Sequence, residues 1–227
     1  MDPVWENLYV AGHNQRYPWD CVVSFIYRHA PRDTPRDETR ILEIGFGTGS
    51  NLWFAAREGF KVSGTDGSDS AVNAAKHRFD SEGLSGDLRC QAFPEIPFED
   101  NQFHLAIDRA ATTCVSREIC RETIQSIHRA LRPSGLFFLN TYSHRHTSAT
   151  AGQLMDDGRR VNIDSGTLTG VGGICFYNET ELMEVLGSGW NVMNLDHVMV
   201  EDRTSNGSVH AEWRAVLQKS DCASNDD

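Results

Sequence analysis

Three alternating glycines and one acidic residue form the first group in the sequence with recognisable chemistry. Gly45, Gly47 and Gly49 directly follow an apolar run, and Asp66 ends the next such run. Glycine lets a backbone turn tightly and lets a ligand lie against it, and a helix that follows presents free N–H groups. An acid at the end of the second strand can accept hydrogen bonds from both hydroxyls of a ribose. These residues predict a site for a nucleoside cofactor.

The spacing of the glycines distinguishes two classes of cofactor. A dinucleotide site favours G-x-G-x-x-G, which would put glycine or alanine at position 50, where this chain has Ser50. The chain reads Glu43-x-Gly45-x-Gly47-x-Gly49, and this resembles the acid-x-Gly-x-Gly-x-Gly motif of the class I S-adenosylmethionine-dependent methyltransferases. Residues 96–103 resemble that family's approach to its fourth strand, and residues 131–136 resemble its turn before the fifth. The resemblance extends over about residues 40–142.

The resemblance implies S-adenosyl-L-methionine as the cofactor. The glycine loop would face its methionine part, Asp66 would hold its ribose, and Ala92 and Phe93 would lie against its adenine. Many family members have an acid near position 92 that contacts the adenine amine, whereas this chain has Ala92. Backbone groups and Phe93 are therefore expected to recognise the adenine here. The expected cofactor-binding residues are Glu43, Gly45, Gly47, Gly49, Asp66, Gly67, Ala92, Phe93, Asp108, Tyr17 and Trp19.

The segment before the first strand, residues 1–36, is unusually rich in aromatic side chains, among them Tyr17 and Trp19. In small methyltransferases this segment often folds over the cofactor. Aromatic faces there would suit a cationic sulfonium and would exclude water. The alternative is that these rings cap the edge of the sheet.

Candidate catalytic residues follow the expected fourth and fifth strands, since ligands of such sheets bind beyond the carboxyl ends of the strands. His144 and His146 share one face if the chain stays extended after Tyr142, and either could take a proton from a hydroxyl or amine acceptor. The alternative is that both are exposed histidines at the start of a loop. A His-x-His pair without a nearby carboxylate is a weak ligand set, so no metal is expected.

Asp108 and Arg109 follow the fourth strand. Asp108 could lie near the methyl donor and Arg109 could bind an anionic acceptor, or the two could bond to each other and to nearby backbone. Tyr142 and Arg145 are the other candidates for contact with the acceptor.

Short apolar runs alternate with helical stretches, which indicates an α/β, Rossmann-like, doubly wound fold in three layers. We expect a seven-stranded, mostly parallel sheet that ends in an antiparallel C-terminal hairpin. The expected strands are 40–44, 61–65, 87–93, 103–107, 136–142, 190–200 and 209–217, and the helices are 51–58, 70–82, 117–131 and 178–186.

Residues 1–218 are expected to form a single domain. Its N-terminal cover is residues 1–36, and residues 143–176 form a loop or insertion over the active site. Loops of that length inside compact domains are usually functional or mobile. Residues 219–227 read as a disordered tail.

The charge and composition restrict the partners. The chain has 21 Lys and Arg against 32 Asp and Glu, a net charge of −11, which disfavours nucleic acid and anionic membrane surfaces. It has no long apolar run and its six cysteines are scattered, so a soluble, cytoplasmic protein is expected. The oligomeric state cannot be read from the sequence.

We therefore expect a methyltransferase that acts on an oxygen or nitrogen atom of a small molecule. The alternatives are a protein side chain as acceptor, a nicotinamide-dependent oxidoreductase, or a module that binds the cofactor without catalysis.

Overall fold

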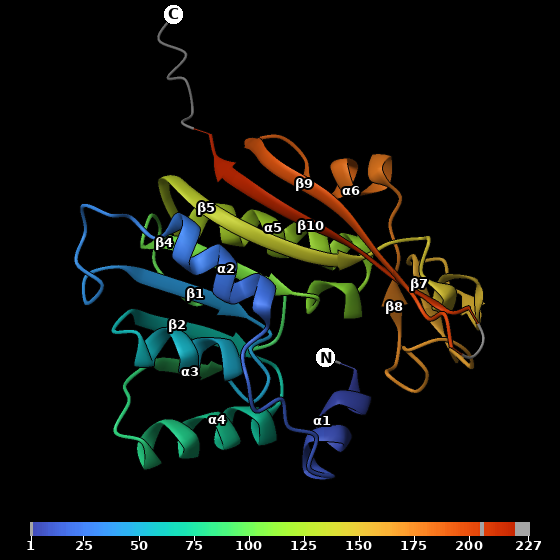
Figure 1. Ribbon diagram of the computed structural model, residues 1–227, viewed down its shortest axis with the longest axis horizontal. Coiled ribbons are helices and arrows are strands. Elements are labelled where there is room, and N and C mark those ends of the chain that lie inside the picture. The colour runs from blue at the N-terminus through green and yellow to red at the C-terminus, as the bar shows by residue number, and fades with distance from the viewer. Residues whose placement is uncertain (1, 205–206, 221–227) are drawn as a thin grey trace, which may run out of the picture.

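A seven-stranded sheet forms the centre of the computed structural model, which describes residues 2–204 and 207–220. The strand order is β3-β2-β1-β4-β5-β10-β9, and β10 runs antiparallel to both of its neighbours (Figure 1). The predicted fold and its C-terminal hairpin are confirmed. The strands are β1 (Arg40–Ile44), β2 (Lys61–Asp66), β3 (Asp87–Cys90), β4 (Phe103–Arg109), β5 (Leu131–Tyr142), β9 (Trp190–Glu201) and β10 (Val209–Lys219).

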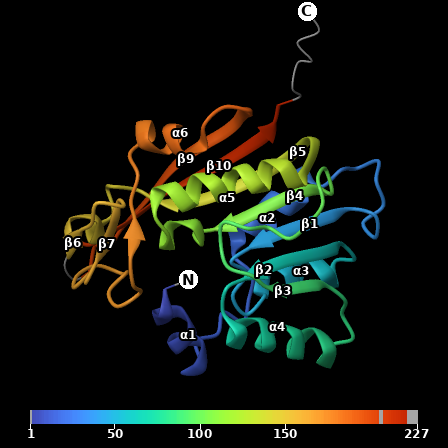
Figure 2. The same cartoon turned by 180° about the vertical axis from the view of Figure 1, so that it is seen from behind.

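Helices cover both faces of this sheet and complete the three layers. Helices α2 (Asp20–His29), α3 (Ser50–Arg57) and α4 (Asp69–Ser81) pack on one face. Helices α5 (Arg117–Ala130) and α6 (Glu179–Leu186) pack on the other, as the reverse view shows (Figure 2). The central strand β1 is apolar on both sides, with Ile41 in one core and Leu42 in the other, as expected for a strand buried between two helical layers.

Side-chain caps start three of these helices. Ser68 and Ser116 accept hydrogen bonds from the first turns of α4 and α5, and Asn178 forms a reciprocal capping box with Glu181 at α6. These caps set the starts of α4, α5 and α6 within one residue of the sequence expectation.

Two strand boundaries differ from the sequence expectation by three residues or more. Strand β3 ends at Cys90 rather than 93, because Pro94, which has no N–H to donate, follows closely. Strand β5 begins at Leu131 rather than 136, because Leu131 pairs with Phe103 across a register shift. Of the expected tail, Lys219 ends β10, and residues 221–227 lie outside the described part.

The insertion after β5 has its own structure, which the sequence did not predict. It contains the 3-10 helix η2 (Thr147–Thr150) and a small antiparallel sheet of β6 (Gln153–Leu154), β7 (Arg159–Val161) and β8 (Ile174–Cys175). A separate apolar cluster, which includes Ile163, Leu168 and Phe176, supports it. Strands of two or three residues are too short to give a periodic pattern.

The N-terminal segment divides into two parts. Helix α2 packs on the main sheet, whereas α1 (Pro3–Val10) stands beyond the carboxyl ends of the strands, between the sheet and the insertion (Figure 1). Glu6 accepts hydrogen bonds from the hydroxyls of Ser68 and Ser70 at the start of α4. Asp2 accepts one from the backbone N–H of Gly173 in the insertion at 3.3 Å. Helix α1 is thus attached to both sides.

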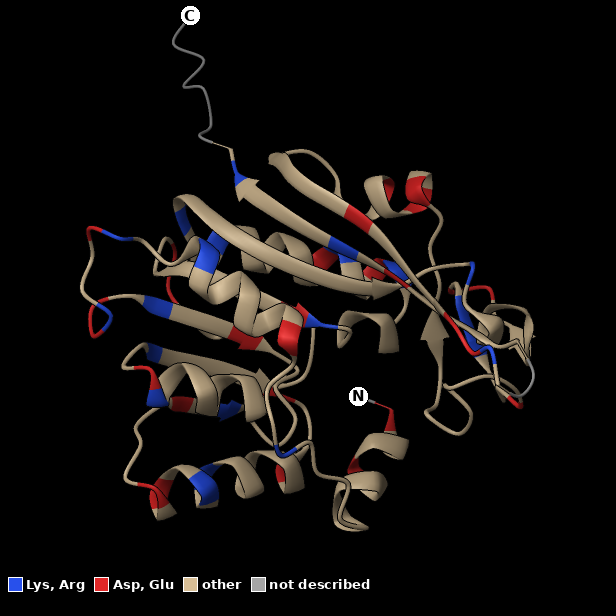
Figure 3. Cartoon of the chain, in the orientation of Figure 1, with Lys and Arg blue, Asp and Glu red and all other residues tan. Residues whose placement is uncertain are grey.

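Charged side chains of both signs are interspersed over the helices and strands (Figure 3). Within residues 2–204 and 207–220, no helix has the length and apolar character needed to cross a bilayer.

Candidate functional site

One cavity of about 590 Å³ lies at the carboxyl ends of the parallel strands. It is bordered by the glycine loop after β1, by helix α1, by the turn between β4 and the 3-10 helix η1 (Thr112–Cys114), by the insertion and by β10. The strand order reverses between β1 and β4, and ligands of open α/β sheets bind at such a point.

The glycine loop has a backbone that only glycine adopts without strain. Gly45, Gly47 and Gly49 have φ values of 61°, 56° and 76°. A Cβ atom on Gly47 would stand 2.8 Å from the hydroxyl oxygen of Tyr9. Gly45 and Gly47 line the cavity, whereas Gly49 faces α4, where a Cβ would stand 3.0 Å from that of Ala75.

Asp66 joins the glycine loop to the end of β2. Its carboxylate accepts hydrogen bonds from the backbone N–H groups of Gly47, at 2.8 Å, and Ser68, at 2.9 Å. Burial raises the pKa of Asp66 above its ordinary value, although these two bonds oppose the shift. Asp66 lines the cavity, and each of its oxygens keeps a lone pair for a further donor.

Glu43 is a buried carboxylate with one unused oxygen. Its Oε1 accepts a hydrogen bond from the side-chain amide of Asn51 at 2.7 Å, and its Oε2 has no partner among the described residues. Burial raises the pKa of Glu43 to about 8, in spite of the bond from Asn51, and nearby Asp108 and Asp66 add to the increase. Since Glu43 lines the cavity, the open oxygen favours a cation or an N–H donor there.

The residues expected around an adenine lie together. Gly67, Ala92 and Phe93 line the same cavity as Asp66. From the N-terminal segment, Trp19 lines the cavity as expected, and so do Trp5 and Tyr9 of α1. Tyr17 does not, because its side chain is 65% exposed and borders a separate hollow near Trp53. That expectation needs correction.

The expectation for Asp108 also needs correction, because its side chain does not line the cavity. Its carboxylate is fully buried and accepts hydrogen bonds from the N–H groups of Ala111, at 2.7 Å, and Thr112, and from the hydroxyl of Thr112. Burial raises the pKa of Asp108 to about 6, against these bonds, which lower it. Asp108 shapes the turn between β4 and η1, and its carboxylate does not reach the cavity in which the methyl donor and the methyl acceptor are expected to bind.

The histidines after β5 do not face the cavity, and neither does Arg145. His144 and Arg145 are exposed outside it. His146 is buried behind the wall, where its Nδ1 accepts a hydrogen bond from the N–H of Ser148 at 3.0 Å. Because the chain turns into η2 after Ser143, the extended geometry that would aim both histidines at one face is absent from this segment.

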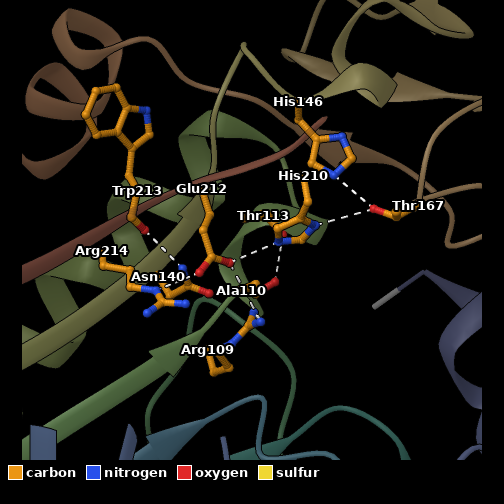
Figure 4. Close-up of polar contacts among 10 residues, drawn as sticks. All are labelled: Arg109, Ala110, Thr113, Asn140, His146, Thr167, His210, Glu212, Trp213 and Arg214. Carbon is orange, nitrogen blue, oxygen red and sulfur yellow. Dashed lines mark hydrogen bonds and ion pairs between the residues drawn. The ribbon is translucent and has the colours of Figure 1, made fainter. Parts of the chain in front are cut away.

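A histidine that the sequence analysis missed lines the cavity instead. His210 lies on β10, with its Nε2 3.3 Å from Glu212 Oε2 and its Nδ1 3.4 Å from the hydroxyl oxygen of Thr167 in the insertion (Figure 4). The sequence does contain a signal: the alternation His210-x-Glu212-x-Arg214 in an extended segment places three ionisable side chains on one face.

Glu212 is the centre of a charged group behind this wall. Arg214 Nε donates to its Oε1 at 2.6 Å, and Arg109 Nη2 lies 3.8 Å from its Oε2 (Figure 4). Burial would raise the pKa of Glu212, but the bond from His210 and the two guanidinium charges outweigh it and lower the pKa to about 2. The group therefore contains one carboxylate and two permanent cations.

Arg109 lines the cavity together with Tyr142, as the sequence analysis expected for acceptor contacts. Its guanidinium lies over the ring of Trp19, 4.0 Å from the centroid. Its Nε is buried and has no hydrogen-bond partner within the described ranges. Arg109 is therefore a cation whose side chain is only 11% exposed and which has donor capacity to spare.

Comparisons with known proteins agree with this geometry. Residues 41–135 match the family model described as a methyltransferase domain. An uncharacterised protein of Haemophilus influenzae is 26% identical over 102 residues, which span 44% of this chain and 41% of that protein. The chain thus matches less than half the length of this relative.

Two solved structures share the fold over nearly the whole chain. One is a SAM-dependent methyltransferase of Methanosarcina mazei, with 19% identity, a TM-score of 0.69, and coverage of 90% of this chain and 99% of that one. The other is the 1,6-didemethyltoxoflavin-N1-methyltransferase of Burkholderia thailandensis, solved with 1,6-didemethyltoxoflavin and S-adenosylhomocysteine. It has 16% identity, a TM-score of 0.68, and coverage of 96% and 88%.

Proposed function

Because the chain carries a class I S-adenosylmethionine-dependent methyltransferase domain, we propose that it moves a methyl group to an oxygen or nitrogen atom of a small molecule. The observation that supports this proposal is a single cavity with two kinds of wall. The glycine loop, Glu43 and Asp66 line one part, and Arg109, Tyr142 and His210 line another.

The residues of the first part fit the cofactor. The open Oε2 of Glu43 suits the ammonium group of its methionine, and the free lone pairs of Asp66 suit the two ribose hydroxyls. The faces of Trp5 and Tyr9 suit a positive charge. When bound, S-adenosylmethionine supplies a methyl group on a cationic sulfur that is a good leaving group.

The protein's own task is then to align the acceptor and keep water out. Alignment of two reactants can supply a large part of the barrier reduction without a catalytic triad. Helix α1, held by Asp2 and Glu6, and the insertion, which contributes Thr167 and Leu168, wall the cavity from outside the sheet.

The size of the cavity supports a small acceptor. A volume of about 590 Å³ lies in the range of small-molecule sites, and the cofactor would fill part of it. The Burkholderia thailandensis neighbour holds a small molecule beside S-adenosylhomocysteine, which supports the same class here. The net charge of −11 weighs against nucleic acid as the acceptor.

Calorimetry with S-adenosylhomocysteine tests the cofactor assignment. We expect wild-type protein to bind it, and Asp66→Ala to bind it roughly 10- to 100-fold more weakly, since a hydrogen bond to a charged group contributes about 1.5–3 kcal/mol. Asp80→Ala, an exposed acid on α4, is the matched control and should bind like wild type. Absence of binding by wild type would overturn the proposal, and unchanged affinity in Asp66→Ala would overturn the ribose role.

Two further measurements separate the alternatives. Binding of NAD in place of S-adenosylhomocysteine would identify a nicotinamide enzyme. Incubation with S-adenosylmethionine and a panel of small hydroxy and amino compounds, with S-adenosylhomocysteine formation as the readout, distinguishes an enzyme from a module that only binds.

A further inference from the structure

The hydrogen bonds around His210 form a chain whose direction is fixed at both ends. At one end the N–H of Ser148 can only donate, so His146 Nδ1 is unprotonated and its Nε2 carries the hydrogen. At the other end a carboxylate can only accept, so His210 Nε2 donates to Glu212. Low pKa values hold both ends in these states, about 4 for His146, chiefly because of its burial, and about 2 for Glu212.

Thr167 connects the two histidines and completes the chain. His146 Nε2–H donates to the hydroxyl oxygen of Thr167 at 3.0 Å, which leaves the hydrogen of that hydroxyl for His210 Nδ1 at 3.4 Å. His210 therefore presents an unprotonated Nδ1 at the cavity wall. Among the described residues, the only hydrogen-bond partner of this nitrogen is Thr167, and because that contact is long and weak, an acceptor hydroxyl could replace it.

One carboxylate and two aromatic rings surround His210. The carboxylate of Glu212 touches its Nε2, and the rings of His146 and Tyr142 lie 5.0 and 5.8 Å from it. The nearby cations, Arg109 and Arg214, are both engaged with Glu212. A buried carboxylate on the far nitrogen stabilises an imidazolium and fixes the ring orientation, as in other histidine bases.

Arg109 lies next to His210 at the same carboxylate oxygen. Glu212 Oε2 is 3.8 Å from Arg109 Nη2 and 3.3 Å from His210 Nε2, so the two cationic or basic groups are close neighbours. With its unpartnered Nε, Arg109 suits an anionic group on the acceptor. The anion and the reacting hydroxyl must then be adjacent in the acceptor, and the rings of Trp19 and Tyr142, which both line the cavity, suit a flat ring.

We propose that His210 is the general base of the reaction, that Glu212 is its positioning residue, and that the acceptor is an aromatic ring with a hydroxyl beside an anionic group. This inference rests on the proposed function. As the acceptor oxygen bonds to the methyl carbon, the carbon–sulfur bond breaks and sulfur keeps its electron pair. The proton of the hydroxyl passes to His210 Nδ1, and from there to solvent after the product leaves.

A pair of probes that differ in one atom tests the base. Salicylate has a phenol hydroxyl beside a carboxylate, and thiosalicylate has in its place an aryl thiol, a much stronger acid that loses its proton to solvent near pH 9 and so depends far less on a base. We expect wild-type protein with S-adenosylmethionine to form the methyl ether of salicylate and the methyl thioether of thiosalicylate, both identified by mass spectrometry.

His210→Asn and His210→Gln should lower kcat on salicylate by about 10²- to 10⁴-fold, the usual contribution of a general base, and change kcat on thiosalicylate by less than about threefold. Their affinity for S-adenosylhomocysteine should equal that of wild type. His77→Gln, an exposed histidine on α4, is the matched control and should resemble wild type in every assay. Glu212→Gln should shift the rise of the pH profile on salicylate to lower pH, because the carboxylate that stabilises the imidazolium is gone, and leave thiosalicylate turnover unchanged.

Each contrary result has a distinct meaning. Equal losses on both probes, or none, would overturn the base assignment. Methylation of the salicylate carboxylate, or turnover of neither probe by a protein that binds S-adenosylhomocysteine, would overturn the acceptor geometry. A wild-type protein that fails to bind S-adenosylhomocysteine would instead refute the proposed function.

Discussion

The two parts of the cavity are built by different means. The cofactor part uses backbone and side chains from short consecutive segments, chiefly residues 43–51 and 66–68, whose glycines and caps fix the geometry locally. The acceptor part uses side chains that come from β4, β5, the insertion and β10, and two of them, Arg109 and His210, meet at one carboxylate, Glu212. A site built from one short stretch of backbone can be recognised in the sequence as a motif. A site assembled from side chains that are distant in the sequence leaves no such motif.

This difference predicts that each substitution changes the binding or turnover of one ligand only, either the cofactor or the acceptor. Changes at the cofactor part should alter affinity for S-adenosylhomocysteine, and changes at the acceptor part should leave that affinity intact.

Gly47→Val should cause the largest loss at the cofactor part. A side chain there meets the hydroxyl of Tyr9 and must adopt a φ of 56°. Strain and overlap together cost roughly 2–4 kcal/mol, or about thirtyfold to a thousandfold in affinity for S-adenosylhomocysteine by calorimetry. Gly83→Val, with φ of 65° and no atom within 4 Å, imposes the backbone strain alone and should leave the affinity unchanged. Equal losses in both variants would show that overlap at the loop is irrelevant.

Glu43→Gln should remove a pH dependence from the stability of the free protein. The folded-state pKa of Glu43 is about 8 against an ordinary value of 4.5, so between these values the folded protein keeps a proton that the unfolded chain has lost. Stability is therefore lost as the pH rises through this window, by up to about 1.4 kcal/mol per pH unit.

Urea unfolding at pH 5, 6.5 and 8 measures this effect. With the neutral glutamine, the free energy of unfolding should fall less as the pH rises. The stability of the variant relative to wild type should therefore increase with pH. Parallel curves for the two proteins would mean that Glu43 is ionised in the folded state well below pH 8.

Thr167→Val tests the hydrogen-bond chain of the acceptor part without any acceptor. The buried His146 Nε2–H would lose its hydrogen-bond partner, at a cost of about 1 kcal/mol in the free energy of unfolding, since water in the cavity can replace part of the bond. Thr167→Ser keeps the hydroxyl and should unfold like wild type. The affinity of both variants for S-adenosylhomocysteine should be unchanged, and a fall in that affinity would contradict the separation of the two parts.

Glu6→Ala should have the smallest effect, because its bonds to Ser68 and Ser70 are only part-buried and water can replace them in part. Partial release of α1 should weaken S-adenosylhomocysteine binding by only about threefold, in the range of exposed polar contacts. Glu184→Ala on α6 is the matched exposed control. A larger loss than that of Gly47→Val would mean that α1, rather than the loop, dominates cofactor binding.

The sequence predicts the cofactor part of the cavity better than the acceptor part. The sheet, its hairpin and the placement of Gly45, Gly47 and Asp66 at one cavity depend on periodicity and turn chemistry, which act over a few residues. The roles of these residues toward the cofactor stay predictions until the calorimetry is done. The same holds for the roles proposed at the acceptor part.

Most of the misplaced residues share one cause. Asp108, His144, Arg145 and His146 were assigned by their position after a strand end, and a turn of one residue changes which way such a side chain faces. Tyr17 was assigned from the aromatic content of its segment, which does not say which rings face the cavity. His210 is 64 positions beyond His146 along the chain, yet the two rings are 5.0 Å apart. Only the tertiary fold brings them together.

The double attachment of α1 has a thermodynamic consequence. Its Asp2 bonds to the insertion and its Glu6 to the start of α4, so one short helix borders both parts of the cavity. A ligand that orders α1 from one side reduces the entropy that the second ligand must overcome. Cofactor and acceptor should therefore bind cooperatively, and linkage requires that each raise the affinity of the other by the same factor.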